Sequence, residues 1–252
     1  MKKLMNVGLF SALLLLYACS QPSQPSQAEE NIARERETMV ADTLDALNTD
    51  TPTEARLRAM GMVDIAEMDS SIAVQLVYAT PYNFLGKQLY YDLNKAFMLP
   101  EMAEKVLKAQ QALKKIRPDL NLLIYDASRP VSVQHEMWNM VKGTSMMPYV
   151  SNPNKGHGMH NYGAAVDVTL MDCTGRPLPM GSEYDFFGEE AHTTNEQQLL
   201  QDGRITKREL ENRLLLRKVM TEAGMHTIQS EWWHFNLTTS ETERQKLQLI
   251  DF

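Results

Sequence analysis

Short apolar runs and one alternating segment predict the strands of this chain. Residues 72–78 alternate between apolar and other side chains, which is the two-residue period of a half-buried strand. The apolar run at 120–125 lies between turn residues and predicts a buried strand. Residues 164–171 form a longer run of the same kind, and two short strands are expected at 226–228 and 234–237.

Three other segments space their apolar residues three or four positions apart, as on one face of a helix. The first begins at Pro100 and ends near Ile116, the second begins at Pro130, and the third spans 205–223 with Gly224 as its C-terminal cap. The stripe of the first helix consists of Met102, Val106, Ala109 and Leu113. Helices and strands alternate, but the strands are few and the loops long. We therefore expect an α+β fold, with a small, mainly antiparallel sheet flanked by helices in a single catalytic domain.

The N-terminus has the pattern of an export signal. Two lysines precede an apolar core at 9–16, which is too short to span a membrane comfortably. The core ends at Leu16-Tyr17-Ala18-Cys19, which resembles the lipobox of bacterial lipoproteins and predicts a lipid anchor at Cys19. A plain secretory signal cut near Ala18 is the alternative. We divide the chain into a lipoprotein signal peptide at 1–19, a flexible tether at 20–59 and a catalytic domain at 60–252.

Composition narrows the possible partners. The 252 residues carry a formal net charge of −7, which argues against non-specific binding to nucleic acid. The sequence has two cysteines, too few for a disulfide framework. Since Cys19 has its own explanation, Cys173 is expected to be a small buried or semi-exposed thiol that does not pair with it. Membrane contact is expected only through the lipid anchor.

Two histidines and an acid suggest a metal site. Asp167 lies within the predicted strand at 164–171, where an unpaired carboxylate would be costly, so it must be paired, hydrogen-bonded or bound to metal. His160 precedes that strand, and Gly163 allows a tight turn between the two residues. His234 supplies a third ligand, which completes the three-ligand set of catalytic zinc. A core aspartate that caps backbone amides is the alternative for Asp167.

Two further residues could supply chemistry beside such a metal. Glu231 lies three positions before His234, with two tryptophans between them, and could take a proton from a metal-activated water. A structural Glu–His pair at a sheet edge would show the same spacing. Arg129 follows the predicted strand at 120–125 and could point into a site, although a surface salt bridge is the commoner role of an arginine.

Four sequence blocks together resemble the zinc D-Ala-D-Ala peptidase family, in particular D-alanyl-D-alanine dipeptidases of the VanX type. The resemblance extends from about residue 62 to 237 and includes a further block, Met180-Gly181-Ser182 followed by Asp185-Phe186. The four blocks are Val77-Tyr78-Ala79-Thr80, Tyr125-Asp126-Ala127-Ser128-Arg129-Pro130, His160 through Asp167, and Glu231-Trp232-Trp233-His234.

The resemblance implies a role for each matching residue. His160, Asp167 and His234 match the ligands of one zinc ion, and Glu231 matches the general base and acid. Arg129 matches the arginine that stabilises the oxyanion. The remaining matches are Asp185 and Tyr78, which in the family hold the free amino group of the substrate.

One position departs from the family pattern. The family usually has a serine two residues before the first zinc histidine, and this chain has Gly158 there. The change leaves zinc binding as expected and bears on how substrate is held. His157 and His192 lie in loops near the matching blocks and could support the site without binding the metal, and Cys173 receives no role.

The resemblance implies hydrolysis of the D-alanyl-D-alanine dipeptide, here in the cell envelope by a lipid-anchored, periplasmic enzyme that turns over cell-wall peptides. One alternative is a D,D-carboxypeptidase or endopeptidase acting on longer peptidoglycan stems. The other is an envelope module that binds zinc without catalysis, which the presence of both Glu231 and Arg129 disfavours.

Overall fold

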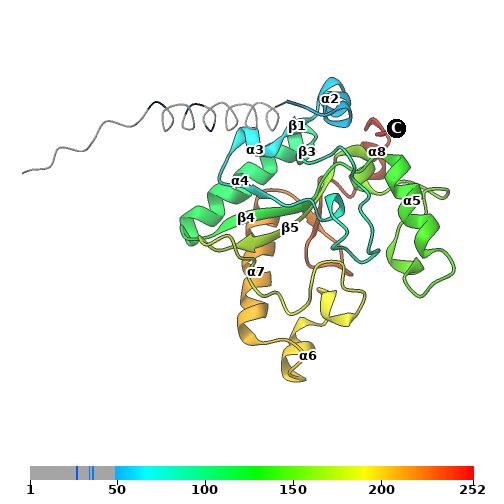
Figure 1. The fold of residues 1–252 in the computed structure, drawn as a ribbon. Helices are drawn as coiled ribbons and strands as arrows, with labels where there is room; N and C mark the ends of the chain where they lie inside the picture. Colours follow the sequence, from blue (N-terminus) through cyan, green and yellow to red (C-terminus); the bar gives the residue numbers. More distant parts are fainter. Residues whose placement is uncertain (1–26, 28–33, 35, 37–48) are drawn as a thin grey trace, which may run out of the picture. The chain divides into compact units, whose positions relative to one another are not determined.

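The centre of the fold is a five-stranded sheet whose strands come from distant parts of the chain (Figure 1). In the computed structural model, which describes residues 27, 34, 36 and 49–252, only the pairing of β2 with β4 is parallel. The strand order is β2 (Ala73–Val74), β4 (Asn121–Asp126), β5 (Ala165–Met171), β7 (His234–Asn236) and β6 (His226–Thr227). The predicted α+β fold with a mainly antiparallel sheet is confirmed.

The core includes β5, because this central strand is covered on both faces. Successive residues of β5 are buried, whichever face they point to, and Val166, Val168 and Leu170 have no exposed surface. Helix α4 (Pro100–Ile116) packs against β4 and against α7 (Lys207–Glu222), and α7 also contacts β5. The predicted apolar stripe of α4 is buried as expected, which anchors this helix to the sheet.

Shorter elements surround this core. Strands β1 and β3 pair with each other as a separate two-stranded sheet. The elements not yet given are α2 (Pro52–Ala59), β1 (Val63–Asp64), α3 (Ile65–Met68), η1 (Val77–Ala79), β3 (Phe97–Met98), α5 (Val131–Val141), η2 (Met147–Tyr149), η3 (Met159–Tyr162), η4 (Glu189–Ala191), α6 (Glu196–Gln201) and α8 (Glu241–Arg244).

The strand predicted at 72–78 is wrong over most of its length. Only β2 pairs with β4, after which the backbone N–H of Gln75 makes one more bond to Ile124 and the chain leaves the sheet. The next residues form the 3₁₀ turn η1 instead. The carbonyl of Tyr78 accepts bonds from the next segment, at Leu89 and Tyr90, rather than from a neighbouring strand. Alternation here reflects burial on one side of a turn rather than a strand.

The compact unit that contains the sheet begins at Asp50 rather than near residue 60. Helix α2 starts it with a capping box, in which Thr51 accepts a bond from the backbone of Glu54 and Glu54 accepts one from the backbone of Thr51. Leu57 on this helix is fully buried. The signal peptide, Cys19 and most of the tether at 20–59 lie outside the described residues.

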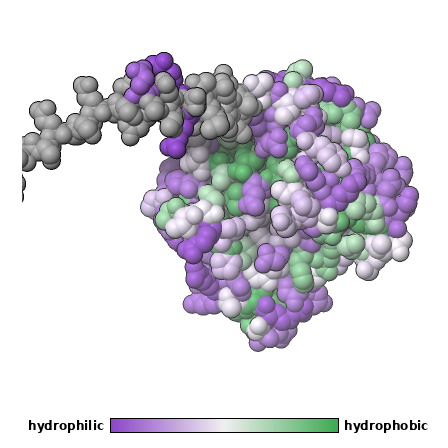
Figure 2. All heavy atoms as spheres, in the orientation of Figure 1, coloured by the Kyte–Doolittle hydropathy of each residue, from purple (hydrophilic) through white to green (hydrophobic). Residues whose placement is uncertain are grey.

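The described part of the chain contains no helix long and apolar enough to cross a membrane. Figure 2 shows hydrophilic and hydrophobic residues interspersed on the visible face of the molecule. Large exposed hydrophobic side chains, such as Tyr82 and Tyr91, are scattered along the sequence. Such scatter is normal for a folded domain and does not indicate a docking face.

Candidate active site

Strand pairing brings the predicted metal ligands together. Asp167 on β5 and His234 on β7 are direct cross-strand partners, so the sheet itself sets their separation. His160 arrives from η3, and Gly163 ends that turn in the left-handed region at φ +65°. A side chain at Gly163 would also meet the Ser128 hydroxyl at 2.9 Å. Glycine is therefore required for both its conformation and its size.

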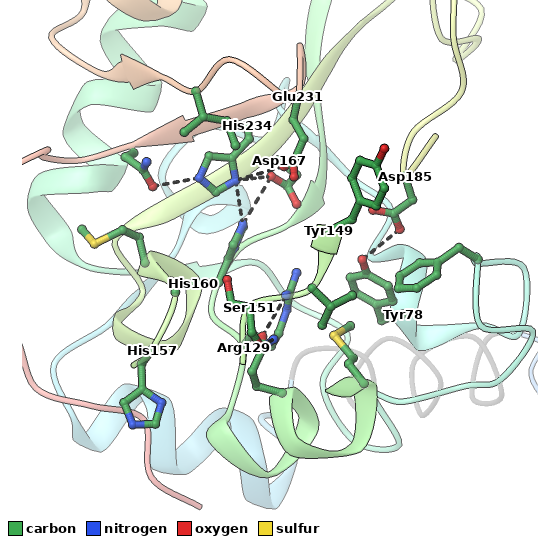
Figure 3. Close-up of a pocket in the computed structure, with 18 of the residues that line it drawn as sticks. Tyr78, Arg129, Tyr149, Ser151, His157, His160, Asp167, Asp185, Glu231 and His234 are labelled. Carbon is green, nitrogen blue, oxygen red and sulfur yellow. Dashed lines mark hydrogen bonds and ion pairs between the residues drawn. The ribbon is translucent and has the colours of Figure 1, made fainter. Parts of the chain in front are cut away.

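The three side chains converge with one ligand atom each (Figure 3). His234 Nδ1 lies 2.9 Å from Asp167 Oδ1, and His160 Nε2 lies 3.3 Å from the same oxygen. The two ring nitrogens are 3.2 Å apart. All three residues are buried, and the cluster brings together the three residues that the sequence predicted as metal ligands.

The outer nitrogen of each ring is held by an oxygen acceptor. His160 Nδ1 donates to the carbonyl of Ala127 at 2.7 Å, and His234 Nε2 donates to Asn236 Oδ1 at 2.8 Å. Since each outer nitrogen is engaged in this way, the inner nitrogens are the atoms that face the position of a metal. Such outer hydrogen bonds orient histidine ligands in metal sites. The donor set therefore fits a bound cation.

The charges in the cluster support one another. Burial alone would raise the pKa of Asp167, but His160 and His234 outweigh it and hold the pKa of this carboxyl well below its usual range. Burial opposes a charged His234, yet Asp167 raises the pKa of His234 to about 9. A carboxylate that stays ionised at any ordinary pH is a ready ligand for a cation.

Glu231 stands beside the cluster without joining it. Its Oε2 lies 3.9 Å from His234 Nδ1, and its side chain remains 24% exposed to the cleft. Burial raises the pKa of Glu231, which makes this carboxylate a better proton acceptor near neutral pH. The position suits a base that acts on a molecule bound next to the metal.

Arg129 is fixed rather than free at the surface. Its Nε and Nη2 both donate to Asp126 Oδ2, at 3.0 and 2.5 Å, and its Nη1 donates to Gln134 Oε1 at 3.0 Å. Its backbone N–H donates to the carbonyl of His160 at 2.9 Å, so the arginine and the ligand loop are joined directly. The side chain is only 12% exposed, which excludes the surface salt bridge.

Tyr78 and Asp185 form a second polar pair on the other side of the cleft (Figure 3). Tyr78 Oη donates to Asp185 Oδ2 at 2.8 Å. Burial raises the pKa of both groups well above the usual values, so the phenol remains a donor. Asp185 has φ +58°, and among the described residues no other non-glycine residue has a positive φ. Strain of this kind is kept where the side chain must point in one direction.

These groups line one cleft of about 340 Å³. The metal-ligand cluster, Glu231 and Arg129 lie at its centre, and the Tyr78–Asp185 pair lies at one end. This volume is at the small end of the range for ligand sites in proteins. Gly158 also borders the cleft, and a side chain there would meet Ser151 Oγ at 3.7 Å and Asn161 Oδ1 at 4.0 Å, both ordinary contacts.

Residues 58–251 match the family model described as D-ala-D-ala dipeptidase, Peptidase_M15. The chain belongs to the M15 peptidase family. It is 32% identical over 179 residues to the D-alanyl-D-alanine dipeptidase of Escherichia coli strain K12, covering 70% of this chain and 84% of that one. It is 29% identical over 194 residues to the D-alanyl-D-alanine dipeptidase of Enterococcus faecium, covering 71% and 92%. Members of this family depend on a metal, and this chain is a metallopeptidase.

Sequence reasoning missed several residues that support the site of this peptidase. Asp126 stood in a quoted block but received no role, although a buried acid three residues before an arginine is a recognisable signal. Tyr184 donates its hydroxyl to Asp167 Oδ2 at 2.9 Å. Asn236 and Gln134 contribute through amide oxygens, which no spacing in the sequence reveals. His192 lies outside the residues that line the cleft, and Cys173 is exposed.

Proposed function

We propose that this peptidase is a zinc-dependent dipeptidase that hydrolyses D-alanyl-D-alanine to two molecules of D-alanine. The observation that carries the proposal is the grouping of a His-Asp-His cluster, a neighbouring carboxylate and a fixed arginine in one small cleft. The named activity of the relatives supplies the substrate.

The ligand set favours zinc. Two imidazoles and one carboxylate are usual zinc ligands, and catalytic zinc sites keep a fourth position open. Zinc–ligand bonds of ~2.0–2.1 Å in a tetrahedral site place the ligand atoms roughly 3.3 Å apart. The three observed separations of 2.9, 3.2 and 3.3 Å are close to that spacing. When bound, zinc polarises the scissile carbonyl and lowers the pKa of a water molecule from ~16 to ~7.

Glu231 and Arg129, beside the cluster, supply proton transfer and charge stabilisation. Glu231 accepts a proton from the attacking water, whose oxygen forms the new bond to the carbonyl carbon. Arg129 stabilises the negative charge that develops on the carbonyl oxygen. Three of its five N–H groups are donated to Asp126 and Gln134, and each of its two Nη atoms carries a second N–H. Glu231 then passes its proton to the leaving nitrogen as the carbon–nitrogen bond breaks.

Asp185 and Tyr78 favour a dipeptidase over a carboxypeptidase. We assign them to the free amino group of the substrate, because a buried carboxylate is a specific partner for an ammonium group. The two side chains are bonded to each other and both line the cleft. A longer stem peptide would have to place an uncharged amide against Asp185 and extend through this contact.

The experiment compares two substrates with and without metal. The purified protein is treated with a chelator, reloaded with zinc, and incubated with D-Ala-D-Ala or with a pentapeptide that ends in D-Ala-D-Ala. Zinc-dependent release of D-alanine from the dipeptide alone is expected. Release from the pentapeptide instead would assign a carboxypeptidase, and release from neither would reject both activities.

We also propose that the enzyme acts in the cell envelope, anchored by lipid at Cys19 and facing the periplasm. The support is the apolar core at 9–16 and the lipobox-like ending, both of which lie in the sequence before the folded unit. In cells, Cys19→Ala is expected to move the protein from the membrane fraction to the soluble fraction. If the wild-type protein is itself soluble, the anchor is absent.

A further inference from the structure

One loop carries two groups of the site, and a single buried arginine holds both ends of that loop. The loop spans 180–192 and includes Tyr184 and Asp185. Arg213 on α7 is 1% exposed. Its Nε donates to the carbonyl of Met180 at the start of the loop, and its Nη2 donates to the carbonyl of Glu190 near the end.

Further contacts hold the loop at the same place. Arg213 Nη1 lies 3.5 Å from the carbonyl of His192. The neighbouring Asn212 donates to the carbonyl of Pro179 at 2.9 Å. A side chain at Gly181, which has φ +83°, would come within 2.6 Å of Ile205 and 3.3 Å of Arg213. The loop is therefore packed tightly against the residue that binds it.

The charge of Arg213 is shared within a small buried cluster. Its Nη1 lies 3.6 Å from Glu196 Oε1. The same carboxylate receives two bonds from Arg217, at 2.9 and 2.6 Å. Glu196 thus makes its shorter contacts with Arg217, and the shorter bonds of Arg213 go to loop carbonyls. Burying an arginine costs desolvation free energy unless its N–H groups are hydrogen-bonded, and here they donate to backbone carbonyls of one loop.

The loop reaches both ends of the site through two adjacent residues. The Tyr184 hydroxyl donates to Asp167 Oδ2, the oxygen of this ligand that is not shared with the histidines. Asp185, the next residue, points its carboxylate to Tyr78 with a strained backbone. Adjacent residues therefore contact the metal ligand and the substrate pocket, and a shift of the loop would disturb both.

We propose that Arg213 is a positioning residue, which holds Tyr184 against the metal ligand and Asp185 in the substrate pocket as one unit. The substrate half of this proposal rests on the proposed function. The metal half does not, because the Tyr184–Asp167 bond exists whatever the substrate is.

Four variants separate the parts. Tyr184→Phe removes the bond to Asp167 and a 3.4 Å contact with the Tyr78 hydroxyl, but it leaves the bond between Tyr78 and Asp185 in place. Asp185→Asn replaces the carboxyl group of the substrate pocket by an amide of the same shape. Arg213→Met removes the clamp with a side chain of similar length, and Glu196 keeps Arg217 as its partner. Arg217→Met is the matched control, because it lies on the same helix and shares Glu196 but makes no bond to the loop.

Two readouts are measured on each zinc-loaded variant, well below its melting temperature. The first is the rate of zinc release to a chelator. The second is the ratio of kcat/KM for D-Ala-D-Ala to that for its N-acetylated form. We expect Tyr184→Phe to weaken zinc retention by about 10- to 100-fold and to leave the ratio unchanged. Asp185→Asn should lower the ratio by about 10- to 100-fold, and zinc release should remain normal.

Arg213→Met should change both readouts in the same directions, and Arg217→Met should change neither. If Arg213→Met leaves either readout at the wild-type value, Arg213 does not hold the loop as a unit and the proposal is wrong. Where Arg213→Met does not fold, Arg213→Lys decides, since it keeps the charge but cannot reach both ends of the loop. If the wild-type enzyme does not cleave the dipeptide, the proposed function fails, and zinc release alone still tests the clamp on Tyr184.

Discussion

Replacing Asp126 by asparagine tests whether Arg129 is held in place by its buried partner. Asp126 has no exposed surface. Its Oδ2 accepts two hydrogen bonds from Arg129, and its Oδ1 accepts one from the Tyr90 hydroxyl at 2.6 Å. Asparagine has the same shape but only one accepting oxygen. Whichever way the amide turns, its NH₂ group faces a donor.

The expected cost follows from this geometry. Burial opposes the charge on Arg129, but Asp126 outweighs it and raises the pKa of Arg129 well above its usual value. Without Asp126 the guanidinium becomes a buried cation without a counter-ion, and removing one partner of a buried pair costs ~3–5 kcal/mol. At ~2–4 °C per kcal/mol for a domain of this size, Tm should fall by about 6–20 °C. A guanidinium misplaced by ~1 Å should lower kcat by about 100-fold.

The assay is thermal unfolding followed by circular dichroism, together with kcat for the dipeptide at a temperature where both proteins are folded. Asp119→Asn is the matched control, because Asp119 also accepts bonds from the Nε and Nη2 of an arginine, Arg117, but on the exposed surface. This control should leave Tm and kcat unchanged. If Asp126→Asn behaves like Asp119→Asn, Arg129 does not depend on Asp126 and the reasoning is refuted.

Three further outcomes are expected. Glu231→Gln should lower kcat by ~10²–10⁴ and keep its zinc in a metal analysis, and near-normal turnover would reject Glu231 as the base. Asp185→Asn should stabilise the substrate-free protein, because burial raises the pKa of Asp185 and its ionisation in the unfolded chain favours unfolding above pH ~4. The gain in the free energy of unfolding should grow with pH up to the folded-state pKa of Asp185. Urea unfolding at pH 5 and pH 8 measures it, and equal stabilities of the variant and the wild-type protein would contradict the expectation. Ile250→Ala should lower the free energy of unfolding by ~2–5 kcal/mol in the same urea assay, because the Ile250 side chain is fully buried. Its backbone bonds Asn161 and Val131 at this place. A smaller loss would mean that neighbouring side chains collapse into the cavity.

The ligand cluster could be predicted because local patterns marked each of its members. Asp167 lies in a run of apolar residues, where only a satisfied carboxylate is tolerated, and His234 lies next to two tryptophans that are now seen to be buried. The helices were also predictable, since α4 and α7 bury regular stripes between clear end signals. In each case the evidence was contained in a few consecutive residues.

The supporting contacts could not be predicted in this way. Arg213 lies 33 residues from the Met180 carbonyl that it binds, and nothing in its own neighbourhood marks it as buried. The segment at 72–78 failed for a related reason, because β2 has a partner for only two residues before Tyr78 turns toward the site. Burial and alternation are local properties, whereas partners are set by the whole fold.

The pairing of β5 with β7 has a consequence for how the protein matures. Asp167 and His234 are 67 residues apart in sequence, and His160 and His234 are 74 apart. The three ligands therefore meet only after the last strand of the central sheet has added to β5. A metal ion cannot nucleate this fold from a local loop, as it does in small zinc domains, but it can lock the sheet once formed. Uptake by the complete set of three ligands therefore requires that β7 is already paired with β5.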